Sequence, residues 1–172
     1  MTISDKYDVQ TGYLKKEAFE EFADMAERED KFKSVPVGVL FTDINDLKKY
    51  HDYYGHAMSD LQIRKVALVI EEATKCRGEY YRFGGDEFVV VFRGFNKETF
   101  DRYMKCIADV RESLESISFA AGECYTESAK DIRVALKTAY ENMRSDKERY
   151  HARHPYTGCF GGFDNMKSGS SF

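Results

Sequence analysis

The sequence predicts an α+β fold in which helices cover a central β-sheet. Three observations support this prediction. Several long segments repeat apolar residues at helical spacing, and shorter runs between them are rich in β-branched and aromatic residues. In addition, two strand-like runs, residues 79–83 and 88–92, flank a Gly-Gly-Asp-Glu turn and should form a hairpin. With 172 residues, the chain is long enough for one domain with a single core.

Helices and strands are expected to alternate along the chain, without repeats or an internal linker. The first helix illustrates the reasoning, because Phe19, Phe22 and Ala26 fall on one helical face. In chain order, the predicted elements are a helix over 16–31, a buried strand over 35–43, a short helix over 46–54 that Gly55 ends, a helix that Asp60 caps or opens and that runs to about residue 76, the hairpin at 79–93, one long helix over 100–117, a strand over 118–125 and a last helix from residue 132.

Composition changes near the C-terminus. From about residue 155 onward, Gly, Ser and Asn dominate the sequence. We therefore predict a single domain over residues 1–154, with a core at about 8–151, and a loosely ordered tail over residues 155–172.

The turn between the two hairpin strands carries the clearest chemical signal. Gly84 and Gly85 have no Cβ, so the backbone can bend there and a bulky ligand can approach closely. Asp86 and Glu87 add carboxylate oxygens, which are hard ligands that suit Mg²⁺. This open, acidic turn would suit a Mg²⁺-bound triphosphate. Alternatively, it is an ordinary surface hairpin in which Gly and Asp serve only the turn geometry.

A second acidic position ends the apolar strand that precedes the short helix. Asp43 is the last residue of this strand, and the helix begins almost at once. A carboxylate followed by free N–H groups at a helix start is an arrangement that binds metal and phosphate. If the two strands are neighbours, Asp43 and Asp86 can share a metal ion. Alternatively, Asp43 or Asn45 simply caps the following helix.

Together, these motifs and their order resemble the GGDEF domains, the diguanylate cyclases of bacterial second-messenger signalling. The spacing between the acidic motifs fits the family without insertion or deletion. The resemblance implies a mostly antiparallel five-stranded sheet flanked by helices, as in the palm of nucleotidyl cyclases and polymerases. The matching segments are residues 8–16, which carry a weak form of the family's opening motif Asp-x-Leu-Thr-Gly-Leu-x-Asn-Arg, then 43–48, 51–56, Asp60, and the complete turn at 84–88 preceded by Arg82.

The resemblance implies that two GTP molecules are condensed into cyclic di-GMP with release of two pyrophosphates. Each ribose 3′-hydroxyl attacks the α-phosphate of the other nucleotide, and Mg²⁺ or Mn²⁺, two ions per active site, would assist this attack. Asp43, Asp86 and the backbone carbonyl of Ile44 are the implied metal ligands. Glu87 is implied either as a ligand of the second metal ion or as the group that helps to deprotonate the 3′-hydroxyl.

The family's backbone contacts to the nucleotide are also implied here. Gly84 and Gly85 would leave room for the ribose and the α-phosphate. The β- and γ-phosphates would be held by the backbone N–H groups of Asn45, Asp46 and Leu47.

Basic side chains should complete the phosphate site. Lys48 and Lys147 match family lysines, whereas His151 replaces a family arginine and makes that contact weaker or dependent on pH. Alternatively, Lys147 is a solvated lysine at a helix end.

Base recognition departs most from the family pattern. Asp60 matches the residue that accepts hydrogen bonds from the guanine N1–H and N2 amino groups, and this disfavours adenine. His51 replaces a family asparagine, and an imidazole cannot donate and accept on one base edge as an amide can. Alternatively, His51 is an exposed helix residue without a base contact. We expect His56 to be structural.

Regulation and assembly follow from the same resemblance. Many family members carry an Arg-x-x-Asp product-inhibition site before the hairpin, but residues 75–78 read Lys-Cys-Arg-Gly, so that site is not expected. Catalysis requires a homodimer, because each domain brings one GTP. Nothing before Asp8 could drive this pairing, so we expect an attached sensory or dimerising domain in a longer protein, or dependence on a partner.

Composition excludes some classes of partner. The balance of 26 basic and 30 acidic residues gives a net charge of −4, which argues against binding to polymeric nucleic acid. The four cysteines form no Cys-x-x-Cys pair and suggest reduced thiols in the cytoplasm. No run approaches the about 18 consecutive apolar residues of a membrane span, so no membrane contact is expected from this segment.

Two functions from different classes are therefore carried forward. The first is a Mg²⁺-dependent diguanylate cyclase. The alternative is a catalytically weak or inactive GGDEF domain that binds GTP or docks to a protein partner, since its base and phosphate contacts are altered. A cyclase that makes an adenine-containing dinucleotide is disfavoured by Asp60.

Overall fold

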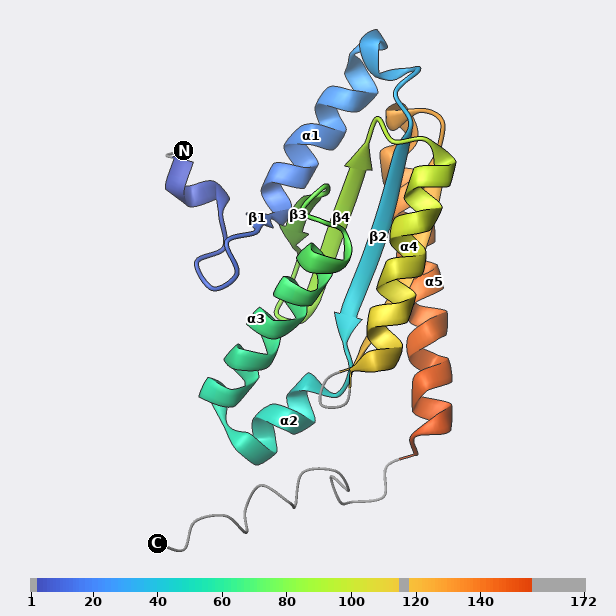
Figure 1. The fold of residues 1–172 in the computed structure, drawn as a ribbon. Coiled ribbons are helices and arrows are strands. Elements are labelled where there is room, and N and C mark those ends of the chain that lie inside the picture. Colours follow the sequence, from blue (N-terminus) through green and yellow to red (C-terminus); the bar gives the residue numbers. More distant parts are fainter. Residues whose placement is uncertain (1–2, 115–117, 156–172) are drawn as a thin grey trace, which may run out of the picture.

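The computed structural model describes residues 3–114 and 118–155 as an alternation of helices and strands (Figure 1). The strands are β1 (Leu14–Lys15), β2 (Val37–Ile44), β3 (Glu79–Arg82), β4 (Glu87–Arg93) and β5 (Phe119–Thr126). The α-helices are α1 (Lys16–Arg28), α2 (Leu47–Tyr54), α3 (His56–Ala73), α4 (Lys97–Ser113) and α5 (Ile132–Arg153), with short 3₁₀ turns at Ile3–Lys6, Asp30–Phe32 and Ala129–Asp131.

The five strands form one sheet in the order β1-β3-β4-β2-β5. Only β1 and β3 pair in parallel, and the other three pairings are antiparallel. The predicted α+β fold with a mostly antiparallel five-stranded sheet and the hairpin between β3 and β4 is thus confirmed.

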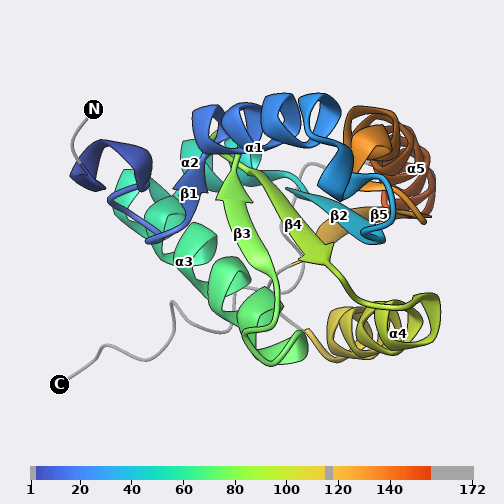
Figure 2. The same ribbon diagram turned by 90° about the horizontal axis from the view of Figure 1, so that it is seen from above.

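Helices cover both faces of the sheet, with α1 and α5 on one face and α3 and α4 on the other (Figure 2). All eight residues of β2 are buried, because this strand lies between β4 and β5. Its side chains alternate: Val37, Val39 and Phe41 join the core under α1 and α5, while Leu40 and Ile44 join the core under α3 and α4. A strand buried on both faces therefore carries Asp43 to its end.

Helix α5 packs closely against β5 because Gly122 has no side chain. A Cβ at this position would lie only 2.1 Å from the backbone nitrogen of Met143. This close approach places the C-terminal half of α5, which carries Lys147 and His151, beside the end of β2.

Several predicted helices have different limits. Helix α1 ends at Arg28 and not at residue 31, because the chain becomes extended at Glu29. Helix α3 begins at His56, so Asp60 lies inside it, and the prediction that Asp60 caps or opens the helix is wrong. The reason is Gly55, whose φ of 85° lets the chain turn from α2 into α3 within one residue. Helix α4 ends at Ser113, where Leu114 turns to an extended conformation, and not at residue 117.

Part of the chain is outside this description. Residues 115–117 and most of the predicted tail, from residue 156 onward, lie outside the described residues. Within the described ranges, no helix is both long enough and apolar enough to cross a membrane.

Candidate active site

The two acidic motifs meet at one end of the sheet. Antiparallel pairing of β2 with β4 places Asp43 directly opposite Glu87. The backbone N–H of Ile44 donates to the Asp86 carbonyl at 3.0 Å, which ties the end of β2 to the turn. The sheet register thus brings together Asp43, Asp86 and Glu87, which sequence reasoning had placed in one site.

Lys147 reaches this acidic group from α5. Its Nζ lies 2.5 Å from Asp43 Oδ1, and Asp43 is only 7% exposed. Burial raises the pKa of the Asp43 carboxyl, the nearby Asp86 adds to this effect, and Lys147 and His151 oppose it. Lys147 therefore interacts with the predicted metal ligand itself and is not a solvated helix-end lysine.

Glu87 is affected by the same crowding of charge. Its pKa is raised first by burial and then by the negative charges of Asp43 and Asp86. Clustered carboxylates of this kind repel one another, and a nearby cation relieves the repulsion. In this structure, the ammonium group of Lys147 is such a cation.

The donor set fits a hard divalent cation in its chemistry. Carboxylate oxygens are the preferred ligands of Mg²⁺. Asn45 also has a buried Oδ1 without a hydrogen-bond partner among the described residues, while its Nδ2 donates to Ser118 Oγ at 3.1 Å. Among these residues, however, no group of three or more His, Cys, Asp or Glu side chains is already arranged around a common point. The side chains thus suit a metal ion, and the carboxylate of Asp43, which would bind this ion, forms an ion pair with Lys147.

The start of α2 only partly matches the predicted phosphate site. Asp46 precedes α2 in a left-handed conformation (φ 56°), its carboxylate pairs with Lys49 at 2.6 Å, and Lys48 is exposed in the first turn. The Asn45 N–H donates to the Ser118 carbonyl at 3.0 Å, and the contact of Asn45, Asp46 and Leu47 with phosphate stays a prediction. The N-cap of α2 is Asp46, so the alternative that Asp43 or Asn45 caps this helix is wrong.

The two base-recognition candidates already have partners. Nε2 of His51 lies 2.7 Å from Nδ1 of His56, which joins the end of α2 to the start of α3. Asp60 Oδ1 accepts a hydrogen bond from Gln10 Nε2 at 3.0 Å. The structure thus pairs His56 with His51, and the structural role of His56 stays a prediction. It also adds Gln10, which sequence reasoning missed, although the weak opening motif was a signal at this place.

Arg82 holds the turn in position. Its Nε donates to the Gly84 carbonyl at 3.1 Å, and its Nη2 donates to the Gly85 carbonyl at 2.8 Å. Its Nη1 forms an ion pair with Asp8 at 2.9 Å, so the opening motif supports the turn from outside the hairpin. A Cβ at Gly85 would have no atom within 4 Å, which leaves open space at the tip of the turn.

Comparison with known proteins identifies the family of this chain. The family profile described as "Diguanylate cyclase, GGDEF domain" matches residues 5–153. The chain belongs to the GGDEF domain family.

The chain is also similar to individual proteins in sequence and to solved GGDEF domains in structure. Diguanylate cyclase A of Treponema denticola is 29% identical over 133 residues, covering 68% of this chain and 35% of that protein. An uncharacterized membrane protein of Staphylococcus epidermidis is 27% identical over 115 residues, covering 67% of this chain and 32% of that protein. The chain thus spans about a third of the length of these two relatives. The GGDEF domain of DgcB from Caulobacter crescentus, solved in complex with c-di-GMP, shares the fold with a TM-score of 0.70 at 20% identity, covering 86% of this chain and 93% of that one.

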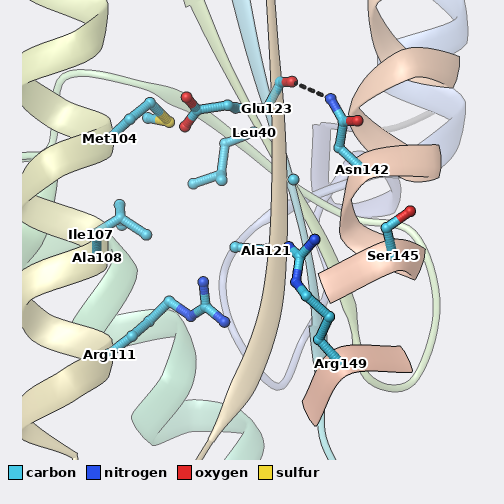
Figure 3. Close-up of a pocket in the computed structure, with 11 residues that line it drawn as sticks. Leu40, Met104, Ile107, Ala108, Arg111, Ala121, Glu123, Asn142, Ser145 and Arg149 are labelled. Atoms are coloured by element: carbon cyan, nitrogen blue, oxygen red, sulfur yellow. Dashed lines mark hydrogen bonds between the residues drawn. The ribbon is translucent and has the colours of Figure 1, made fainter. Parts of the chain in front are cut away.

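A pocket in this GGDEF domain lies away from the predicted site. It has a volume of about 290 Å³ and lies between α4 and α5 with β5 as its floor (Figure 3). Arg111 and Arg149 both extend toward one end of it (Figure 3). Asp146 on α5 accepts from Arg111 Nη2 at 2.5 Å and from the Ala121 N–H at 3.0 Å. This contact anchors α5 one residue before Lys147, so the walls of the pocket help to place Lys147.

Proposed function

We propose that this GGDEF domain condenses two GTP molecules into cyclic di-GMP, with release of two pyrophosphates and with Mg²⁺ or Mn²⁺ as cofactor. The observation that carries the proposal is the direct opposition of Asp43 and Glu87 on β2 and β4, beside an open glycine turn. Family membership and the Treponema denticola relative named diguanylate cyclase support the same reaction.

The bound metal would supply charge neutralisation at the α-phosphate and activation of the 3′-hydroxyl. Asp43, Asp86 and the Ile44 carbonyl are the proposed ligands, and Glu87 either binds the second ion or accepts the hydroxyl proton. Before nucleotide and metal arrive, Lys147 balances the charge of Asp43 at 2.5 Å. It is then available to contact phosphate oxygens, which carry more negative charge than a single carboxylate.

The remaining residues would orient the nucleotide. The open space at Gly85 would accommodate the ribose and the α-phosphate. Asp60 and His51 would contact the guanine. His151, one turn after Lys147, lies close enough to Asp43 to lower the pKa of that carboxyl. Because one domain holds one GTP, the reaction requires two domains facing each other.

One observation favours the alternative of a weak or inactive GTP-binding or docking module. Both base-recognition side chains are engaged within the chain, His51 with His56 and Asp60 with Gln10. GTP must displace His56 before its base can contact Nε2 of His51, which lowers its affinity.

The test is incubation of concentrated protein with GTP and Mg²⁺, followed by chromatography and mass spectrometry of the products. The Asp86→Ala, Glu87→Ala double variant removes the acidic turn. Asp101→Ala is the matched control, because this exposed carboxylate lies on α4 and forms an ion pair with Lys97. Cyclic di-GMP from the parent and the control, but not from the double variant, would support the cyclase. GTP binding without product, even after fusion to a dimerising helix, would support the regulatory module.

A further inference from the structure

Gln10 bridges two charged side chains from different parts of the candidate site. Its Nε2 donates to Asp60 Oδ1 at 3.0 Å and lies 3.3 Å from the Asp60 backbone oxygen. Its Oε1 accepts from Arg82 Nη1 at 2.7 Å. A single amide thus connects α3, which carries Asp60, with Arg82 at the end of β3.

The chemistry of the two partners fixes the orientation of this amide. An arginine side chain can only donate hydrogen bonds, and an ionised carboxylate can only accept them. Rotating the amide by half a turn would place its NH₂ against the guanidinium and its oxygen against the carboxylate. The family's opening motif has leucine at this place, and a leucine could make neither bond.

The Arg82 end of the bridge is itself firmly held. The Arg82 side chain is only 11% exposed and is bound to Asp8 and to the carbonyl groups of both turn glycines. Because Gln10 is attached to this fixed group, the hydrogen bond to Asp60 restricts the carboxylate relative to the turn. The position of the Asp60 carboxylate, the predicted guanine contact, therefore depends on the position of the turn that carries the proposed metal and phosphate site.

We propose that Gln10 is a positioning residue for guanine recognition, which holds the Asp60 carboxylate in the orientation that receives the guanine N1–H and N2 amino groups. This rests on the proposed function, because it assumes that Asp60 contacts the base. Gln10 occupies one lone pair of Oδ1, and each carboxylate oxygen has two, so both oxygens can still accept hydrogen bonds from guanine. Loss of the bridge frees the carboxylate to rotate, and both contacts weaken.

The test compares equilibrium binding of GTP and ITP, which lacks the 2-amino group, by calorimetry in Mg²⁺. Gln10→Leu installs the family residue, and Gln10→Glu keeps the shape while placing a second carboxylate against Asp60. Val9→Ala is the control, because Val9 is adjacent in sequence and 99% exposed. We expect the GTP:ITP affinity ratio to decrease about fivefold in Gln10→Leu, the effect of one hydrogen bond, and further in Gln10→Glu. The ratio should be unchanged in Val9→Ala.

Two further readouts separate positioning from a merely structural role. In thermal unfolding, Gln10→Glu should have the same Tm as the parent. If Gln10→Leu loses stability, the GTP:ITP ratio of Gln10→Glu therefore shows whether Gln10 acts on guanine recognition. In turnover assays, KM for GTP should increase more than kcat decreases, since the altered contact is to the base and not to the reacting atoms.

The outcomes distinguish this inference from the proposed function. An unchanged GTP:ITP ratio in both Gln10 variants would overturn the inference, even if the parent makes cyclic di-GMP. A parent that prefers GTP and loses this preference in the variants, yet makes no cyclic di-GMP, would support the inference and count against the cyclase.

Discussion

Replacement of Gly122 by alanine tests how α5 is positioned. The added Cβ would lie 2.1 Å from the Met143 nitrogen and 2.2 Å from the Ala139 oxygen. Ordinary contacts of carbon with other heavy atoms are about 3.5–4.0 Å, so β5 and α5 must separate by more than about 1 Å. Because both neighbouring atoms belong to the helix backbone, no side-chain rotation can relieve the contact.

The expected cost follows from this overpacking. Inserting a methyl group into a close-packed site costs about 1–3 kcal/mol of the free energy of unfolding. In a domain of this size, each kcal/mol lowers Tm by roughly 2–4 °C, so Tm should decrease by roughly 2–12 °C. Lys147 should also move away from Asp43, so cyclic di-GMP formation should decrease in the fraction that remains folded.

Circular dichroism during thermal and urea unfolding measures the stability, and the product assay measures the activity. Gly85→Ala is the matched control for stability, because a Cβ there has no atom within 4 Å and the residue does not have positive φ. It should melt close to the parent. If Gly122→Ala melts at or above the parent temperature, the argument from backbone contact is wrong.

Three further predictions concern the site itself. Burial and the neighbouring carboxylates raise the pKa of Glu87 in the folded protein above its value in the unfolded chain. The stability that Glu87 contributes is therefore fully present below its ordinary pKa of about 4.3. It is lost as the pH rises through the pKa of the folded state. Replacing Glu87 with Gln removes the charge, so the gain in unfolding free energy over the parent should be larger at neutral pH than in acid. Urea unfolding at several pH values measures this difference. A difference that does not change with pH would mean that the pKa is not raised. Mg²⁺ at about 100 times its Kd should stabilise the parent by about 2.7 kcal/mol, but not the Asp86→Ala, Glu87→Ala variant; equal shifts of Tm in both proteins would place the metal elsewhere. His51→Asn should increase GTP affinity about fivefold by restoring an amide at the base, and calorimetry that shows a decrease would mean that the His51–His56 pair supports the site.

The sheet and its acidic end were predictable because the signals are local. Aromatic and β-branched runs around a glycine turn identify the hairpin of β3 and β4, and an apolar run ending in Asp43 identifies β2. Helix limits were less predictable. Gly55 allowed α3 to begin at His56, which placed Asp60 inside the helix, and the apolar spacing that suggested a helix to residue 117 does not show where α4 ends.

Contacts between distant segments could not be read from the sequence. Gln10 and Asp60 are 50 positions apart, and Arg82 and Asp8 are 74 positions apart. Nothing local to either residue indicates its partner, because each of these polar side chains could equally have faced solvent. The same holds for the pairing of His51 with His56 across Gly55, which depends on the angle between α2 and α3.

The sequence by itself determined the fold class, the family and the identity of the acidic and basic groups, since these depend on local periodicity and on residue types at fixed spacing. Tertiary structure alone decided how those groups are used. The register of β2 against β4 sets Asp43 opposite Glu87, the close approach of α5 over Gly122 brings Lys147 onto Asp43, and the folding of the opening segment onto α3 gives Asp60 a partner in Gln10. Such contacts arise from packing of whole elements, and packing is a property of the folded chain rather than of any one segment.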